Sequence, residues 1–199
     1  MRGYVYDERI GGYRDRETGR KVATKTVLNM VQLNNNYAKQ NISEITDKFF
    51  DGRLTLPQWQ DAIKAEIKQE WLVAMMAGRG GKDQMTQADY GRLGGRLSYE
   101  YRKLADFAIE IKSGNLSEAQ IRARIALYAD GARTGFWDGL QAAQTAAGKT
   151  EERRILGEAE HCQSCMAYAA MGWQPLGSLP SPGTQCECLH NCKCTKEYK

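Results

Sequence analysis

The hydrophobic pattern divides the chain into a helical middle and two ends without helical periodicity. Between residues 24 and 150, apolar residues recur mostly at steps of three and four, the spacing of amphipathic helices. Residues 1–23 have no such period and contain several glycines, so we expect an extended N-terminal arm. Residues 151–199 are rich in cysteine, proline and glycine and form a third segment.

Start and stop signals predict about four long helices in the middle segment. Capping boxes with the pattern Ser/Thr-x-x-Gln occur at residues 55–58 and 117–120, and residues 86–89 can also cap a helix. Glycine follows each apolar stripe, as expected where a helix ends. The expected helices cover about residues 24–51, 55–78, 86–114 and 117–147. This order predicts a mainly α fold of antiparallel helical hairpins.

Composition limits the classes of protein that the chain can represent. The 28 basic and 24 acidic residues leave a net charge of +4, which permits nucleic-acid binding without arguing for it. The longest apolar run, residues 71–77, is far shorter than the roughly 20 residues that cross a bilayer. The chain also opens without the apolar run of a secretory signal. We therefore expect a soluble protein with no membrane partner.

Six cysteines fall within the last 38 residues, and the first 161 residues contain none. The Cys162-x-x-Cys165 pair can aim two thiolates at one tetrahedral ion, and a second cluster about 20 residues later can supply the other ligands. Cys188 and Cys192 have the next most compatible spacing, and Cys194 can substitute for either. The spacing predicts one zinc ion in a small C-terminal module that buries little core of its own.

Other states of the cysteines remain open. The six cysteines could instead form three disulfides or remain unligated thiols. The absence of a secretory signal favours a metal site over disulfides. Cys186 and Cys188 would point to opposite sides of an extended chain, so Cys186 falls outside the predicted ligand set. His190 could ligate through its imidazole, but a surface turn is its commoner role, and the same holds for His161.

Catalytic motifs are missing from the sequence. No GxSxG, Walker-type loop or GxGxxG that opens a helix occurs, and both histidines lie beside the cysteines. The glycine-rich break at residues 78–82 lacks the length and the hydroxyl of a phosphate loop. We therefore expect no enzyme activity, no catalytic or cofactor-binding residues and no small-molecule substrate.

Several motifs together resemble one family. They are Tyr-Arg-Asp-x-x-Thr-Gly-Arg at residues 13–20, Ser-x-x-Gln-Ile-x-x-Arg at 117–124, His-Cys-x-x-Cys at 161–165, Gly-Trp at 172–173 and Asn-Cys-Lys-Cys at 191–194. With the long helices between them, they are similar to the minor head proteins of tailed phages of the phage Mu F-type, also called head morphogenesis proteins. The resemblance spans nearly the whole chain and is most specific from His161 to Cys194. Cys186 is a departure from that pattern, and the chain is shorter than many members.

The resemblance implies a structural virion component. It suggests a minor head or head–tail connector (adaptor) protein at the portal vertex, in a ring of identical copies. The implied partners are the portal, neighbouring copies of the chain, and neck or tail proteins, with viral DNA passing nearby. The implied location is the virion head or neck, after assembly in the cytoplasm of the bacterial host. No catalytic residues carry over.

A zinc-knuckle nucleic-acid-binding protein is the alternative function. In that interpretation the metal module and basic residues of the arm contact phosphate and bases. The arm residues concerned are Tyr13, Arg14, Arg16, Arg20, Lys21 and Lys25, and those of the module are Lys193, Lys196, Tyr198 and Lys199. Asp15 and Glu17 interrupt the basic run, which weakens the alternative.

Overall fold

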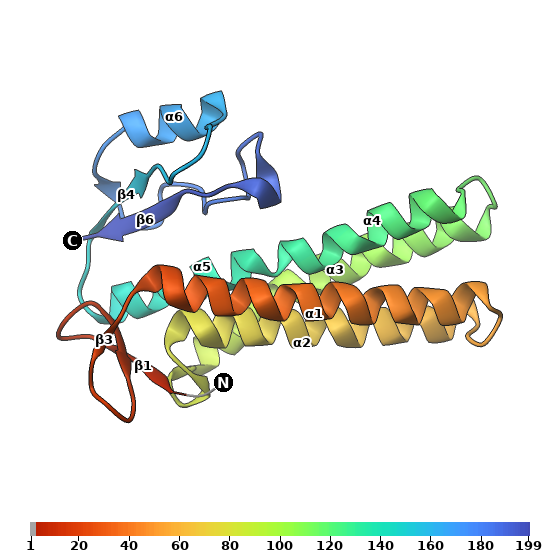
Figure 1. Ribbon diagram of the computed structural model, residues 1–199, viewed down its shortest axis with the longest axis horizontal. Helices are drawn as coiled ribbons and strands as arrows, with labels where there is room; N and C mark the ends of the chain where they lie inside the picture. Colours follow the sequence, from red (N-terminus) through yellow and green to blue (C-terminus); the bar gives the residue numbers. More distant parts are fainter. Residues whose placement is uncertain (1–2) are drawn as a thin grey trace.

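Long helices dominate the computed structural model, which describes residues 3–199 except for the side chain of His190. The helices are α1 (Thr24–Phe50), α2 (Leu56–Arg79), α3 (Gln87–Lys112), α4 (Glu118–Gly131) and α5 (Arg133–Ala146). α2 packs between α1 and α3, and α4 returns along α1, so that the chain runs up and down through antiparallel hairpins (Figure 1). The prediction of a mainly α fold is confirmed. None of the described helices is long and apolar enough to span a membrane.

The predicted capping boxes begin three of these helices. The Thr55 amide donates to Gln58 Oε1 at 2.9 Å, and the Ser117 amide donates to Gln120 Oε1 at 2.8 Å. Each hydroxyl in turn accepts from the amide three residues later, and Thr86 forms the same box with Asp89. These reciprocal bonds satisfy amides that have no partner within the helix. They explain why the sequence located the helix starts correctly.

The fourth expected helix is divided in the structure. α4 ends at Gly131 and α5 begins at Arg133. The Ala132 amide donates to the Ala129 carbonyl at 3.2 Å, and the Ala132 carbonyl accepts from the Gly135 amide at 2.8 Å, so the backbone is tightened at the break. Beyond this break, α5 packs very closely on α2. A Cβ added at Gly78 would lie 2.0 Å from the Phe136 carbonyl oxygen, and one at Gly139 would lie 2.3 Å from that of Met75. Only glycine permits this approach.

The N-terminal segment is extended, but it is not a free arm. β1 (Tyr4–Asp7), β2 (Gly12–Asp15) and β3 (Lys21–Val22) form an antiparallel sheet in the order β1-β2-β3. Tyr4 and Tyr6 alternate toward the core and pack edge-on against Tyr13, whose hydroxyl donates to the Gly78 carbonyl at 2.7 Å. This burial fixes the sheet to the end of α2, because each tyrosine removes a large apolar surface from water.

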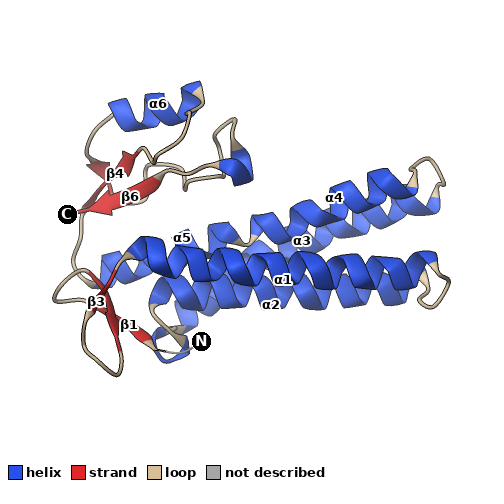
Figure 2. Cartoon of the chain, in the orientation of Figure 1, coloured by secondary structure: helices blue, strands red, loops and turns tan. Residues whose placement is uncertain are grey.

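The core has two parts along the bundle. One lies among α1, α2, α3 and α4 and is centred on Trp59 and Phe107, both fully buried. The other joins the N-terminal sheet to α1, α2 and α5 through Phe136 and Trp137. Figure 2 shows that the strands gather at one end of the long helices, and the second part of the core, which includes Tyr4, Tyr6 and Tyr13 of the N-terminal sheet, lies at that end.

The C-terminal module, residues 151–199, contains the second sheet. β4 (Glu151–Ile155) pairs with β5 (Gln174–Pro175) on one side and with β6 (Thr195–Tyr198) on the other, all antiparallel. The short helix α6 (Gln163–Ala170) lies between β4 and β5 in sequence, and η2 (Leu189–Asn191) precedes β6. A further short turn, η1 (Lys82–Gln84), joins α2 to α3. Tyr198 packs against the bundle core and attaches the module to the helices.

Candidate metal centre

Three short segments bring the cysteines together. Cys162 precedes α6 and Cys165 lies in its first turn, so the helix start presents both side chains to one side. Cys186 and Cys188 lie just before η2, and Cys192 and Cys194 lie between η2 and β6. All six are free thiols that pack in a single cluster, with four of them buried. We refer to these six residues as the cysteine cluster.

Four of the sulfurs are close enough to hold a metal ion. Those of Cys165, Cys186, Cys188 and Cys192 all lie within 4.8 Å of one another. Cys188 Sγ is 3.5 Å from Cys165 Sγ and from Cys186 Sγ, and Cys165 Sγ is 3.6 Å from Cys192 Sγ. Bonds of about 2.3 Å to a tetrahedral zinc ion separate two sulfurs by about 3.8 Å, whereas a disulfide requires about 2.05 Å. The observed separations fit shared coordination.

The predicted ligands are divided between this group and its edge. Cys165, Cys188 and Cys192 belong to the group of four. Cys162 lies beside it, with its sulfur 3.5 Å from that of Cys188. Cys194 is buried in the same cluster and interacts with the thiols of Cys165 and Cys192. The structure thus brings all five predicted cysteines into one cluster.

Cys186 belongs to the compact group although the sequence interpretation left it out. That interpretation assumed an extended chain, but the backbone turns, and the Leu189 amide donates to the Cys186 carbonyl at 2.9 Å. Leu189 itself adopts a left-handed conformation with a φ of 42°, which is uncommon for a non-glycine residue. The turn places the sulfurs of Cys186 and Cys188 on the same side. The side chain of His190, the other uncertain ligand, lies outside the described residues.

Backbone amides favour the thiolate form of two cysteines. Burial raises the pKa of Cys162, but the amides of Cys165 and Cys188 donate to its sulfur, and the net pKa is about 7. Burial also raises the pKa of Cys192, but hydrogen bonds from the Cys194 amide and neighbouring thiols outweigh it, so the net pKa is lowered. At Cys188, burial and neighbouring thiols raise the pKa to about 12. Crowded thiols of this kind release their protons most readily when a cation binds and the sulfurs coordinate it as thiolates.

Two arginines flank the cluster, of which Arg154 is buried and Arg133 is half-buried. Arg154 Nη1 lies 4.0 Å from Cys192 Sγ, and its guanidinium stacks over the Tyr168 ring. Arg133, the first residue of α5, donates from Nη1 to the Cys192 carbonyl at 2.7 Å and thereby joins the cluster to the bundle. Burial lowers the pKa of Arg133, and the nearby thiols oppose that shift. Positive charge here complements thiolates that a metal ion does not fully neutralise.

A buried ion pair supports the module behind the cluster. Lys196 Nζ donates to Glu152 Oε2 at 2.9 Å and to the Leu179 carbonyl at 2.8 Å, and the Leu179 amide donates to Glu152 Oε1 at 2.8 Å. Both charged side chains are almost inaccessible to solvent. These bonds hold the Pro/Gly-rich segment against β4 and β6, because an unpaired buried charge would be costly.

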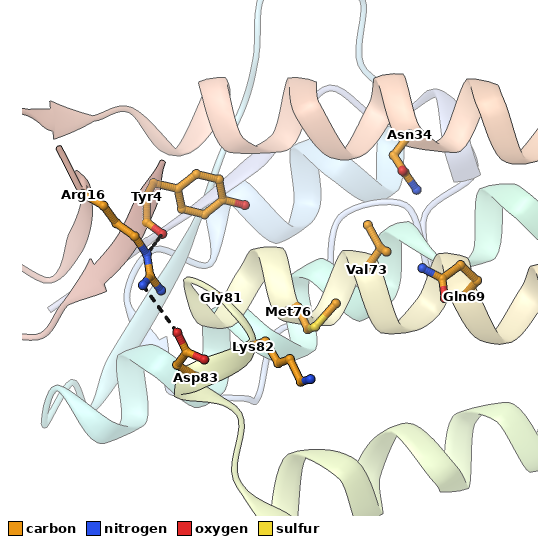
Figure 3. Close-up of a pocket in the computed structure, with 9 residues that line it drawn as sticks. All are labelled: Tyr4, Arg16, Asn34, Gln69, Val73, Met76, Gly81, Lys82 and Asp83. Carbon is orange, nitrogen blue, oxygen red and sulfur yellow. Dashed lines mark hydrogen bonds and ion pairs between the residues drawn. The ribbon is translucent and has the colours of Figure 1, made fainter. Parts of the chain in front are cut away.

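A separate depression of about 480 Å³ lies between the N-terminal sheet, α1, α2 and η1 (Figure 3). Within it, Arg16 Nη1 is 3.4 Å from Asp83 Oδ2, and Arg16 Nε donates to the Tyr4 carbonyl at 3.1 Å. Val73 and Met76 supply apolar surface from α2. These polar contacts join the sheet to η1. Among the described residues that line the depression, no nucleophilic side chain lies beside a general base. The depression therefore gives weaker support for chemistry than the cysteine cluster does.

Comparisons with known proteins add no assignment. No protein-family model matches the chain, and neither the curated proteins nor the solved structures gave a match. The candidate site therefore rests on the geometry of the cysteine cluster, which could hold a metal ion.

Proposed function

We propose that the chain is a structural component of a tailed-phage particle, a minor head or head–tail connector protein at the portal vertex. In this proposal it acts by assembly rather than by catalysis, as one of a ring of identical copies. The resemblance of residues 161–194 to the phage Mu F-type family supports the proposal. The cysteines of that motif lie in one cluster, as a shared structural role would require.

An exposed apolar row on α1 carries the assembly role. Met30, Leu33 and Tyr37 are 40%, 60% and 69% exposed, and their spacing places them on one face of the helix. The buried residues of α1, such as Val31 and Ala38, occupy a different face. Three neighbouring large apolar side chains in water favour burial against another protein surface. We name Met30, Leu33 and Tyr37 the α1 row.

Zinc is the metal that we propose for the cysteine cluster. Thiolates are soft ligands, and a tetrahedral set of sulfurs suits zinc in a structural site. The C-terminal module is short and buries few large apolar side chains, so metal binding would supply much of its folding free energy. A rigid module at one end of the bundle can then contact the portal or a neighbouring copy.

The zinc-knuckle alternative loses several of its expected contacts. Arg14 Nε pairs with Asp7 at 2.6 Å, and Arg16 pairs with Asp83. In the module, Lys196 is buried with Glu152, and Tyr198 is packed against the bundle. Basic and aromatic side chains that are engaged within the protein contribute less to phosphate and base recognition. Assembly is therefore the function that the geometry supports better.

Incorporation into phage particles tests the proposal. We expect mass spectrometry of purified particles to detect the full-length chain. A Leu33→Glu/Tyr37→Glu variant should keep its thermal stability but fail to join particles, because the charges oppose burial of the α1 row. The control Gln32→Glu/Asn36→Glu adds the same charge to exposed positions on another face of α1 and should join normally.

Two results would contradict this assignment. One is the absence of the chain from purified particles, and the other is normal incorporation of the Leu33→Glu/Tyr37→Glu variant. Strong, salt-dependent binding of the isolated protein to duplex DNA would instead support the zinc-knuckle alternative.

A further inference from the structure

The cysteine cluster contains more metal-binding atoms than one ion can use. A structural zinc ion takes four ligands in a tetrahedron. The group of four sulfurs satisfies that number and leaves the thiols of Cys162 and Cys194 beside it. A nitrogen atom joins them, because His161 Nδ1 lies 3.8 Å from Cys194 Sγ. The cluster therefore offers six sulfurs and one imidazole nitrogen.

The hydrogen bond of His161 leaves that nitrogen free to bind a metal. His161 Nε2 is 2.8 Å from the Gly157 carbonyl oxygen. A carbonyl oxygen can only accept, so Nε2 carries the proton and Nδ1 presents its lone pair toward Cys194. Histidine ligands commonly donate their second ring N–H to a backbone carbonyl in this way, which fixes the tautomer and the ring orientation. His161 thus has the arrangement of a ligand rather than of a surface turn residue.

Cys165 occupies the centre of the cluster. Its sulfur lies 3.5 Å from Cys188 Sγ and 3.6 Å from Cys192 Sγ, and it also interacts with the thiols of Cys162 and Cys194. The side chain is fully buried. A thiolate that contacts sulfurs on both sides can bridge two ions.

We propose that the cysteine cluster binds two divalent metal ions that share the Cys165 thiolate. Two tetrahedral ions with one shared ligand require seven donors, which is the number the cluster provides. This assignment divides the group of four between the two ions. The sulfurs of Cys162 and Cys186 each lie 3.5 Å from that of Cys188, so these three complete the first ion. Cys192 contacts the Cys194 thiol, which lies 3.8 Å from His161 Nδ1, so these three complete the second. The proposal deepens the proposed zinc site and rests on metal binding by the cluster.

The surrounding charges fit a two-ion centre. Two dications and six thiolates carry a formal net charge of about −2. Arg154 and Arg133 lie beside Cys192, on the side of the cluster assigned to the second ion. The guanidinium groups of buried Arg154 and half-buried Arg133 balance that charge, which would be costly to leave uncompensated among buried sulfurs.

Counting the bound ions tests the proposal. The full-length protein would be purified anaerobically without chelator, and zinc would be measured by elemental analysis and native mass spectrometry. We expect about two ions per chain. Replacement of zinc by cadmium should give two cadmium NMR signals, one from an all-sulfur site and one from a site with three sulfurs and one nitrogen.

Single substitutions assign the ions to their ligands. His161→Ala should reduce the count to about one ion and remove the nitrogen-coordinated cadmium signal, because the second ion loses a ligand. Cys186→Ser should instead perturb the all-sulfur signal. The control Glu160→Ala changes an exposed neighbour and should keep both ions.

The results separate this proposal from simple metal binding. One ion per wild-type chain, with a single cadmium signal, would overturn the two-ion centre and leave a single zinc site standing. Retention of both ions in His161→Ala would overturn the seven-donor assignment. A content below about a tenth of an ion per chain, with the thiols oxidised in pairs, would overturn metal binding altogether. Because the wild-type count is itself decisive, the test does not depend on every variant folding.

Discussion

Gly78 is the position at which one added methyl group should most disturb the bundle. A Cβ there would lie 2.0 Å from the Phe136 carbonyl oxygen and 2.7 Å from the Leu140 amide nitrogen. Both are backbone atoms, which cannot rotate away as a side chain can. Because non-bonded carbon contacts need about 3.5 Å, α2 and α5 would have to separate by about 1 Å or more in Gly78→Ala.

The separation of the two helices should destabilise the fold by more than the higher helix propensity of alanine stabilises it. Overpacking of a core costs about 1–3 kcal/mol and sometimes more. Phe136 and Trp137, which are almost fully buried beside this contact, would also lose packing. Alanine recovers only about 0.5–1 kcal/mol through its higher helix propensity. We therefore expect Gly78→Ala to lower the free energy of unfolding by about 2 kcal/mol or more.

Urea unfolding followed by circular dichroism measures the effect, with Gly94→Ala as the matched control. Gly94 lies within α3, and nothing lies within 4 Å of an added Cβ there. That control should raise the free energy of unfolding by about 0.5–1 kcal/mol. If Gly78→Ala proves as stable as Gly94→Ala, the close packing of α2 on α5 is refuted.

Three further predictions follow from the helix caps and the buried charges. Thr55→Ala and Ser117→Ala should each lower the free energy of unfolding by about 1 kcal/mol in urea titrations, because each leaves terminal amides without their acceptor; no loss in either would contradict the capping role. Burial raises the pKa of Glu70 from 4.5 to about 7, so the folded protein binds this proton more tightly than the unfolded chain does. The resulting stabilisation is fully present below pH 4.5 and is lost as the pH rises through 7, so Glu70→Gln should be more stable than the wild type by about 3 kcal/mol at pH 8 and show little difference at pH 4; identical pH profiles would oppose this. Lys196→Met leaves the Glu152 carboxylate buried and unpaired and should cost about 3–5 kcal/mol by thermal unfolding, whereas adding Glu152→Gln should recover part of the loss; a neutral Lys196→Met would contradict the buried pair.

Local signals in the sequence identified most of the helical body. The capping boxes at Thr55 and Ser117 each lie within four consecutive residues, so a short stretch of sequence is enough to predict them. The break at Ala132 has no such local signal. It reflects the close approach of α5 to α2, which depends on Gly78 and Gly139 from different helices.

The N-terminal sheet depends on a surface that the sequence does not reveal. Tyr4 and Tyr6 alternate as in a short strand, but the glycines and charged residues around them are typical of a free, extended arm. The decisive contact is the hydrogen bond from Tyr13 to the Gly78 carbonyl, 65 residues away. Deletion of residues 1–23 would therefore uncover part of the bundle core rather than remove an independent arm.

The candidate site could be located from the sequence but not resolved into its members. The five cysteines that the spacing selected lie in one cluster. The side to which Cys186 points depends on the turn at Leu189, and the orientation of His161 depends on its bond to Gly157. Both are properties of the folded backbone, which spacing alone does not determine.

Hydrogen exchange with and without bound metal tests the central claim most directly. The claim is that a metal ion on the cysteine cluster supplies the folding free energy of the C-terminal module. If it is correct, a chelator that removes the metal under reducing conditions should abolish amide protection across residues 151–199, while the helices at residues 24–146 keep theirs. Unchanged protection of residues 151–199 after complete removal of metal would contradict the claim.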